Sequence, residues 1–320
     1  NYNNTVFNGI ITIGPEMGDI LENGEKGMEV RTETCRFATG SGMSWGWSKD
    51  IGIYALAAAV NSLAAEGIEC AGVEAQILFP SRADHSNVYA LEKSFRKTCL
   101  ERGIEMIRTQ VQSKPLAALP AITVLACGTA HGGSMQHSCM ETAHAGDMIV
   151  LVKWIGIEGM LRIADEKGDE LRQRFAPVFI RQIQSRHREL FAGKEIEIAR
   201  RAGVSSVRQI TEGGILAALW DLAKDTGLGL DLDMKRMSVL QETIEVCEQY
   251  RINPYQLTSA GSFLMVTADG KALTDALGEN QIQGSVIGRF TAGNDKIIHN
   301  GEDVRYLDRP APDEIYKILM

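Results

Sequence analysis

Long hydrophobic runs are missing from this 320-residue sequence. Its longest apolar stretches, 53–60 and 148–152, fall far short of the roughly 20 residues needed to cross a bilayer, and no basic region followed by an apolar one opens the chain. Basic residues are in the minority, with 33 Lys and Arg against 41 Asp and Glu, and no basic stripe alternates with aromatic residues. These absences predict a cytoplasmic protein whose partners include neither a membrane nor nucleic acid.

Cysteine is scarce and scattered. The six cysteines stand singly, without a C-x-x-C pair, in a chain long enough to need no disulfide framework, so reduced thiols are expected. Cys127 ends the apolar run 121–127 and is predicted to lie in the core. Hydrophobic residues at 44% and charged residues at 23% exclude a disordered or fibrous chain, and the length of 320 residues favours two domains.

Apolar periodicity predicts strands and helices that alternate along the chain, which is typical of an α/β or α+β fold. Strands are predicted over 5–13, 28–31, 73–79, 104–109, 121–128, 147–153, 262–267 and 284–290. Helices are predicted over 51–66, 87–102, 159–167, 169–188, 193–202, 215–226 and 239–250.

Two segments interrupt this periodicity. Residues 38–49 are rich in Gly and Ser and carry Trp45 and Trp47, so we expect a loop that could act as a lid over a ligand. Residues 131–146 are rich in Gly, Ser, Met and His, and a new strand begins directly after them, which predicts a domain boundary. The two predicted domains are 1–145 and 146–320.

Several short motifs are distributed over nearly the whole chain. They are Gly14-Pro-Glu-Met-Gly-Asp19, Val60-Asn-Ser-Leu-Ala-Ala-Glu-Gly67, Ala145-Gly-Asp147 with Gly156-Ile-Glu-Gly159, Ile210-Thr-Glu-Gly-Gly214 with Ala217-Ala-Leu219, Ile252-Asn-Pro254, Thr258-Ser-Ala-Gly-Ser262 and Pro312-Asp-Glu-Ile-Tyr-Lys317. In this order and spacing they resemble the superfamily of AIR synthetase, selenophosphate synthetase, thiamine-monophosphate kinase and the HypE-type hydrogenase maturation protein. The resemblance is closest to the HypE-related branch.

This resemblance implies a two-domain fold in which an N-terminal sheet domain forms a homodimer and a C-terminal α/β domain covers it. It also implies a nucleotide site between the domains, where Mg²⁺ and ATP serve phosphoryl transfer to an oxygen. The cofactor-binding positions that it assigns in this chain are Asp19, Glu33, Asn61, Ser62, Arg108, Gln112, Glu212, Gly213 and Gly214. Asp19 and Glu33 are the expected magnesium ligands.

The acidic and small polar positions among these also have a structural interpretation. Asp19 and Glu33 could bind magnesium, or could be solvated charges at the ends of a turn and a strand. Asn61 and Ser62 could face the nucleotide cleft, or could be satisfied by neighbouring backbone within a buried helix.

The arginines and the glycine turn leave two interpretations as well. Arg108 and Arg208 could bind phosphate oxygens bidentately, or could pair with Glu33 and Glu212. The turn that opens the helix after Glu212 could receive an anion at its free N–H groups, or could be an ordinary turn capped by Thr211.

The segment 131–146 contains His131, His137, Cys139 and His144. Imidazole and thiolate groups suit Zn²⁺, Fe²⁺ or copper, which makes these four residues candidate transition-metal ligands. Because no pair has the usual structural-zinc spacing, an interdomain loop is the competing interpretation, and a nucleophilic Cys139 beside a histidine is a third.

Two functional hypotheses follow. The favoured one is a HypE-like protein that binds ATP or another nucleotide with Mg²⁺ and transfers a phosphoryl group to a small-molecule or protein acceptor. The alternative is a catalytically inactive dimeric scaffold, or a binder of a small anionic ligand, that has lost the metal–ATP site.

Overall fold

The computed structural model describes residues 36–115, 117–130 and 143–320. Within these ranges the strands form two sheets, one of four strands in the order β1-β4-β2-β3 and one of seven in the order β11-β10-β7-β9-β5-β8-β6. Strands up to Ala130 belong to the first sheet, and strands from Met148 onward belong to the second. Helices and strands are mixed in both parts, which confirms the predicted α/β (α+β) class.

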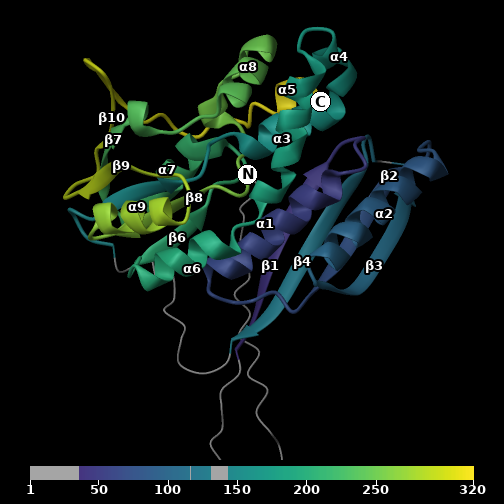
Figure 1. Cartoon of the computed structure of the whole chain (residues 1–320), viewed down its shortest axis with the longest axis horizontal. Helices are drawn as coiled ribbons and strands as arrows, with labels where there is room; N and C mark the ends of the chain where they lie inside the picture. The colour runs from purple at the N-terminus through teal and green to yellow at the C-terminus, as the bar shows by residue number, and fades with distance from the viewer. Residues whose placement is uncertain (1–35, 116, 131–142) are drawn as a thin grey trace, which may run out of the picture.

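Within the described residues, helices cover one face of the first sheet. It consists of β1 (Arg36–Trp45), β2 (Gly72–Pro80), β3 (Glu105–Lys114) and β4 (Ala121–Ala130), with α1 (Ile51–Ala65) and α2 (His85–Glu101) packed against it. β2 and β3 run parallel, whereas β1 and β2 both pair antiparallel with β4. Figure 1 shows that the described helices leave the opposite face of this sheet uncovered.

The predicted loop 38–49 was wrong over most of its length, because residues 38–45 lie in β1 and pair with β4. The glycines that suggested a loop instead allow α1 to approach the strand, since a Cβ at Gly40 or Gly42 would overlap carbonyl oxygens of that helix. Trp45 is held by the chain itself, because its ring stacks on Tyr316 with centroids 5.5 Å apart.

The prediction that Cys127 lies in the core was also wrong. The alternate residues Ile122, Val124 and Ala126 of β4 are buried, whereas Cys127 is half-buried on the opposite face, with its thiol 3.3 Å from the carbonyl oxygen of Gly72. Successive side chains of a strand point to opposite faces, so an apolar run does not put every member inside. The cysteines within the described ranges are free thiols, as expected.

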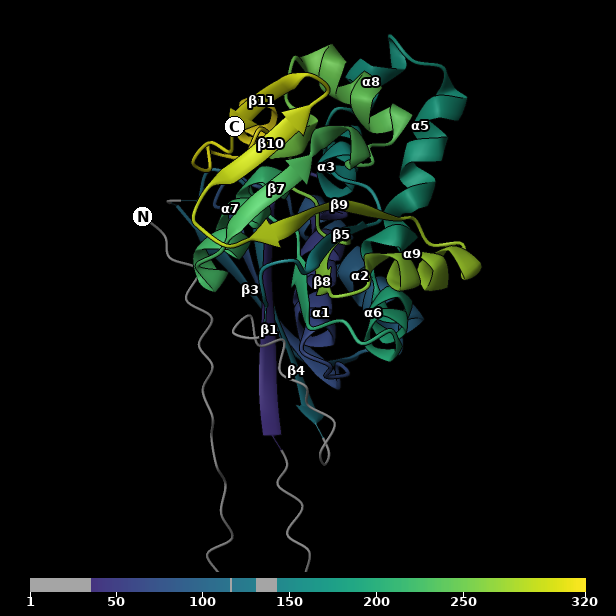
Figure 2. The same cartoon turned by 90° about the vertical axis from the view of Figure 1, so that its left-hand side faces the viewer.

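The second sheet has helices on both faces. Its strands are β5 (Met148–Val152), β6 (Ser206–Gln209), β7 (Gly229–Asp233), β8 (Phe263–Thr267), β9 (Gly284–Thr291), β10 (Lys296–Asn300) and β11 (Asp303–Tyr306). Its α-helices are α3 (Ile157–Glu166), α4 (Gly168–Arg172), α5 (Pro177–Gln184), α6 (Gly193–Arg201), α7 (Gly214–Thr226), α8 (Gln241–Tyr250), α9 (Gly270–Glu279) and α10 (Tyr316–Leu319). Short 3₁₀ helices are η2 (Ser185–Leu190), η3 (Met234–Arg236) and η4 (Pro254–Gln256). Figure 2 shows β11 and β10 at one edge of this sheet.

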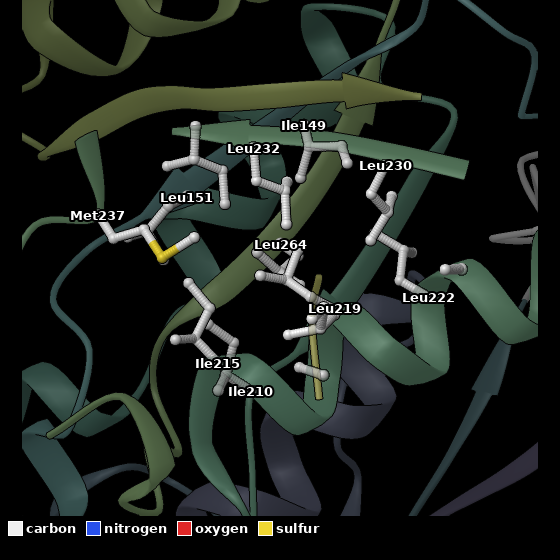
Figure 3. Packing of buried hydrophobic residues seen from close by; sticks show 14 of the residues in the cluster. Ile149, Leu151, Ile210, Ile215, Leu219, Leu222, Leu230, Leu232, Met237 and Leu264 are labelled. Atoms are coloured by element: carbon white, nitrogen blue, oxygen red, sulfur yellow. The ribbon is translucent and has the colours of Figure 1, made fainter. Parts of the chain in front are cut away.

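The central strands are apolar on both sides because both sides are covered. On one face Ile149 and Leu264 pack with Leu219 and Leu222 of α7, as Figure 3 shows. On the other face α6 and α9 cover the same strands.

The helix predicted over 169–188 is divided into α4, α5 and η2. Pro177 begins α5, where its missing N–H costs nothing, and a proline inside a continuous helix would have removed a hydrogen bond. No helix within the described ranges is long and apolar enough to span a bilayer.

Candidate functional site

Asn61 lies on α1 where the parts of the chain that carry the two sheets, which are our two predicted domains, meet, and it is 1% exposed. Its Nδ2 donates to the carbonyl oxygen of Leu190 at 2.7 Å and to Oε1 of Gln209 at 2.9 Å. Its Oδ1 accepts from the N–H of Ala192 at 3.1 Å. The side-chain amide therefore uses both its donor and its acceptor groups to join α1 to the second domain, which is the structural interpretation of this residue.

Ser62 and Gln209 lie beside Asn61 in the same contact between α1 and the second domain, which we call the seam. The hydroxyl of Ser62 donates to the carbonyl oxygen of Ala58 one turn earlier, at 2.8 Å. Nε2 of Gln209 donates to that same oxygen at 3.1 Å. Both Asn61 and Ser62 therefore form hydrogen bonds within the chain, as the structural interpretation of these residues expects.

The turn Glu212–Gly214 does receive an anion, but the anion belongs to the chain. The N–H of Gly213 donates to Oδ2 of Asp313 at 2.7 Å, and Glu212 accepts a hydrogen bond from the hydroxyl of Tyr316 at 2.6 Å. Gly213 and Gly214 have φ angles of 80° and 66°, a backbone conformation that residues other than glycine rarely adopt. The cap of α7 is Gly213 without a side-chain bond, so the predicted Thr211 cap was wrong.

Asp313 is 2% exposed and also accepts from the N–H of Ile315 at 2.9 Å. Burial raises the pKa of this carboxyl to about 6, although its two backbone donors lower the pKa and so oppose the shift. A second buried acid lies nearby: Glu158 accepts from the hydroxyl of Thr258 at 2.6 Å and from the N–H of Ala260 at 2.9 Å. Motifs that carried the family resemblance thus meet around two buried carboxyl groups.

Sequence reasoning assigned no role to Glu158 or Asp313. The sequence did contain a sign of such a role. Each acid lies within one of the motifs that carry the family resemblance and has apolar neighbours, and a buried charge needs hydrogen-bonding partners. Both side chains hold loops of the second domain together, so the structure gives them a bracing role.

Arg108 and Gln112 lie on β3, on the side of the first sheet away from α1 and α2. The outward positions of β2 and β3 surround a shallow hollow, which is lined by Glu74, Ala75, Gln76, Arg108, Gln110, Thr123 and Leu125. Nε of Arg108 lies 3.0 Å from the side-chain oxygen of Gln110 once that amide is oriented to accept. Arg208 is elsewhere and pairs with Asp225, so its predicted pairing with Glu212 was wrong.

Of the candidate metal ligands, the structure describes His144 alone. Asp19, Glu33, His131, His137 and Cys139 lie outside the described residues. His144 is described; its side chain is 80% exposed and its ring lies 3.8 Å from the carboxylate of Asp147. The described ranges contain no group of three or more His, Cys, Asp or Glu side chains arranged to hold a metal ion.

The predicted site residues thus occupy three surroundings. Asn61 and Ser62 lie in the seam between the domains, the strand 108–112 faces outward from the first sheet, and the turn 212–214 is bound by the C-terminal segment. The outward face of β3 carries the exposed Arg108 beside the partly exposed Gln110 and Gln112, whereas the exposed Glu212 of the turn is hydrogen-bonded to Tyr316.

Comparison with known proteins matches this architecture to a family. Residues 144–300 match the model of the AIR synthase related protein, C-terminal domain. The putative hydrogenase expression/formation protein of Methanocaldococcus jannaschii is 20% identical over 280 residues, which cover 84% of this chain and 79% of that protein. The carbamoyl dehydratase HypE of Cupriavidus necator is 22% identical over 256 residues, which cover 79% of this chain and 69% of that protein.

Solved structures share the fold. HypE from E. coli, a hydrogenase maturation protein, superposes with a TM-score of 0.70 at 18% identity, over 88% of each chain. A HypE in complex with ATP gives a TM-score of 0.63 at 15% identity and covers 93% of this chain and 90% of its own. Residues 144–300 therefore match the AIR synthase-related C-terminal domain, and the chain as a whole is similar to HypE-type proteins in sequence and in fold.

Proposed function

We propose that this protein binds ATP or another nucleotide through its phosphates on the outer face of β3, beside Arg108. Arg108, Gln110 and Gln112 occupy alternate positions of one strand, so their side chains share a face that the described helices leave uncovered. Arginine binds phosphate oxygens with two parallel hydrogen bonds, and glutamine amides donate further ones. The ATP complex of a HypE supports a nucleotide as the ligand.

Magnesium enters this proposal through Asp19 and Glu33, the acids that the resemblance assigns to it. A phosphate-bound Mg²⁺ ordinarily relies on one or two carboxylates, so two acids are enough for a single ion. Arg108 would supply part of the positive charge that further metal ions provide elsewhere.

The first test is a calorimetric titration of ATP into metal-stripped protein, repeated with excess Mg²⁺. Arg108→Gln should weaken binding at least about tenfold, because a hydrogen bond to a charged group contributes about 1.5–3 kcal/mol. Arg305→Gln is the matched control: Arg305 is an exposed arginine on β11 of the other domain, and its loss should leave the affinity unchanged. Equal affinities for both variants would refute the assignment of the phosphates to β3.

Phosphoryl transfer to a small-molecule or protein acceptor, in cytoplasmic hydrogenase maturation, is the activity that we infer from such a site. If the inference holds, bound ATP is hydrolysed slowly with Mg²⁺ alone, and Asp19→Asn and Glu33→Gln reduce that rate more than they reduce binding. Release of inorganic phosphate from the wild type and the two variants measures both effects.

A specific observation favours the alternative of a dimeric scaffold or small-anion binder. The amide of Asn61 and the N–H of Gly213 are both engaged by groups of the chain, so two predicted contributors to a nucleotide site are used internally. Under this alternative ATP does not bind with or without Mg²⁺, which the same titration detects.

We further propose that a second copy of the chain covers the β1–β4 half of the uncovered face. Met43 is 64% exposed and Leu125 is 41% exposed there, and burying both in a shared interface would remove apolar surface from water. Met43→Asp combined with Leu125→Asp should halve the mass measured by light scattering, whereas Val304→Asp on β11 should not. A wild type that is monomeric at micromolar concentration would contradict the proposal.

A further inference from the structure

A buried hydrogen-bond cluster joins α1 to the second domain at the end opposite Asn61. Tyr54 of α1 is 1% exposed, and its hydroxyl donates to Oδ2 of Asp165 on α3 at 2.5 Å. Nε2 of His187 on η2 lies 2.9 Å from the same oxygen and 3.1 Å from the Tyr54 hydroxyl. The other ring nitrogen, Nδ1, lies 2.7 Å from the carbonyl oxygen of Gln184.

The chemistry of these partners determines where the protons are. The carbonyl oxygen of Gln184 can only accept, so Nδ1 of His187 must carry a hydrogen. Oδ2 of Asp165 already accepts from Tyr54, and a bare Nε2 at 2.9 Å would place a lone pair against a carboxylate oxygen. A proton therefore lies between Nε2 and Oδ2, and it belongs on the imidazole, which is the stronger base, while the hydroxyl of Tyr54 stabilises the carboxylate.

We propose that His187 is a doubly donating imidazolium that locks η2 to Asp165 of α3, beside the point where Tyr54 of α1 binds the same carboxylate, and that deprotonation releases this lock. When Nε2 loses its hydrogen, both Nε2 and Asp165 become acceptors. The single hydroxyl of Tyr54 can then donate to only one of them. The cluster loses one hydrogen bond, and a buried carboxylate keeps at most one of its two donors.

The charges around the ring favour the protonated state. Burial lowers the pKa of His187, but the hydrogen bond and charge of Asp165 outweigh that effect, so the pKa is raised above its usual value of 6.5. Asp50, which caps α1 and pairs with Lys49 at 2.6 Å, adds a further negative charge. The other charged side chains on α3 are Arg162, which pairs with Glu158, and Glu166, which accepts from the N–H of Ser48 at 2.6 Å. On η2 they are Arg188 and Arg186, the latter paired with Glu189 and with Glu242 of α8.

The position of the cluster explains what the lock would control. η2 spans six residues: His187, its third residue, bonds to Asp165 of α3 beside Tyr54, and Leu190 at its end accepts from Asn61 of α1. Losing the bond between His187 and Asp165 weakens the hold on η2, whereas the bond from Asn61 to Leu190 remains. A rise in pH therefore loosens η2 where it packs beside Asp165 and Tyr54.

The experiment is a titration of the histidine ring signals by NMR, with His187 assigned by the spectrum of His187→Gln. We expect the ring of His187 to titrate above pH 6.5 and Asp165→Asn to move that transition down by at least one pH unit. Tyr54→Phe should move it upward, because the carboxylate then has His187 as its remaining donor in the cluster. A purely structural histidine would not respond to these two variants in opposite directions.

Stability supplies the second measurement. The pKa is raised in the folded protein, so the stabilisation is complete below pH 6.5 and is lost as pH rises through the folded value. As pH rises from 6.5 to the folded-state pKa and beyond, the folding equilibrium constant of the wild type should fall relative to that of His187→Gln. The fall is about tenfold for each unit by which the folded-state pKa exceeds 6.5. A transition at or below pH 6.5 in the wild type, or no shift in Asp165→Asn, would overturn the proposal even if His187→Gln does not fold.

Discussion

Replacing Asn61 by aspartate distinguishes a structural amide from a ligand-facing one. Aspartate has the same shape, but it cannot donate to Leu190 or Gln209 and would place a carboxylate against two acceptors. An uncompensated buried charge costs about 3–5 kcal/mol, so we expect Asn61→Asp to destabilise the protein by about 4 kcal/mol. Asn61→Ala leaves three partners unpaired and should cost about 3 kcal/mol.

Urea denaturation followed by circular dichroism and by tryptophan fluorescence measures these losses. The two probes must give the same midpoint, because a two-domain chain can unfold in steps. Ser62→Ala is the matched control: its half-buried hydroxyl returns to its own helix, and its loss should change stability by less than about 0.5 kcal/mol. If Asn61→Asp costs less than about 1 kcal/mol, the side chain faces water or a ligand, and the structural interpretation fails.

Other contacts give further predictions. Gly42→Ala should destabilise the protein by at least about 2 kcal/mol, because the new Cβ would overlap the carbonyl oxygen of Ala55, and a lower thermal midpoint checks this. Asp313→Asn should speed hydrogen exchange at Gly213, because an amide cannot accept from Gly213 and Ile315 with both of its polar atoms. The pKa of Asp313 is raised from 3.8 to about 6, so its contribution favours folding below pH 3.8 and is lost as pH rises through about 6. Asp313→Asn should remove that part of the pH dependence of urea stability.

The elements that sequence predicted correctly are those with a strong repeating pattern. The helices predicted over 51–66 and 215–226 match α1 and α7 within two residues at each end, because their buried stripes extend over several turns. The missed strands β6, β7, β10 and β11 have only four or five residues each, and each contains charged or polar residues among its apolar ones. Such short strands owe their existence to neighbours in the sheet, which local patterns do not reveal.

The site was harder to predict for a related reason. The resemblance assigned Asn61 to cofactor binding, whereas the partners that its side chain has in the structure, Leu190, Ala192 and Gln209, are 129 to 148 positions away in the sequence. No local pattern identifies such partners, so a ligand-facing amide and a bracing one look the same in sequence. Gly213 presented the same ambiguity, since a free helix N-terminus and one bound by Asp313 share one motif.

The Asn61 and Arg108 experiments together separate fold from function. A large cost for Asn61→Asp with ATP binding that depends on Arg108 would mean that the amide braces the domains while a nucleotide binds on β3. A large cost without any ATP binding would mean that internal hydrogen bonds have taken over part of the family's site, which is the scaffold alternative. A small cost with magnesium-dependent binding would instead return Asn61 to the nucleotide cleft, and the seam seen here would then have to open for ligand.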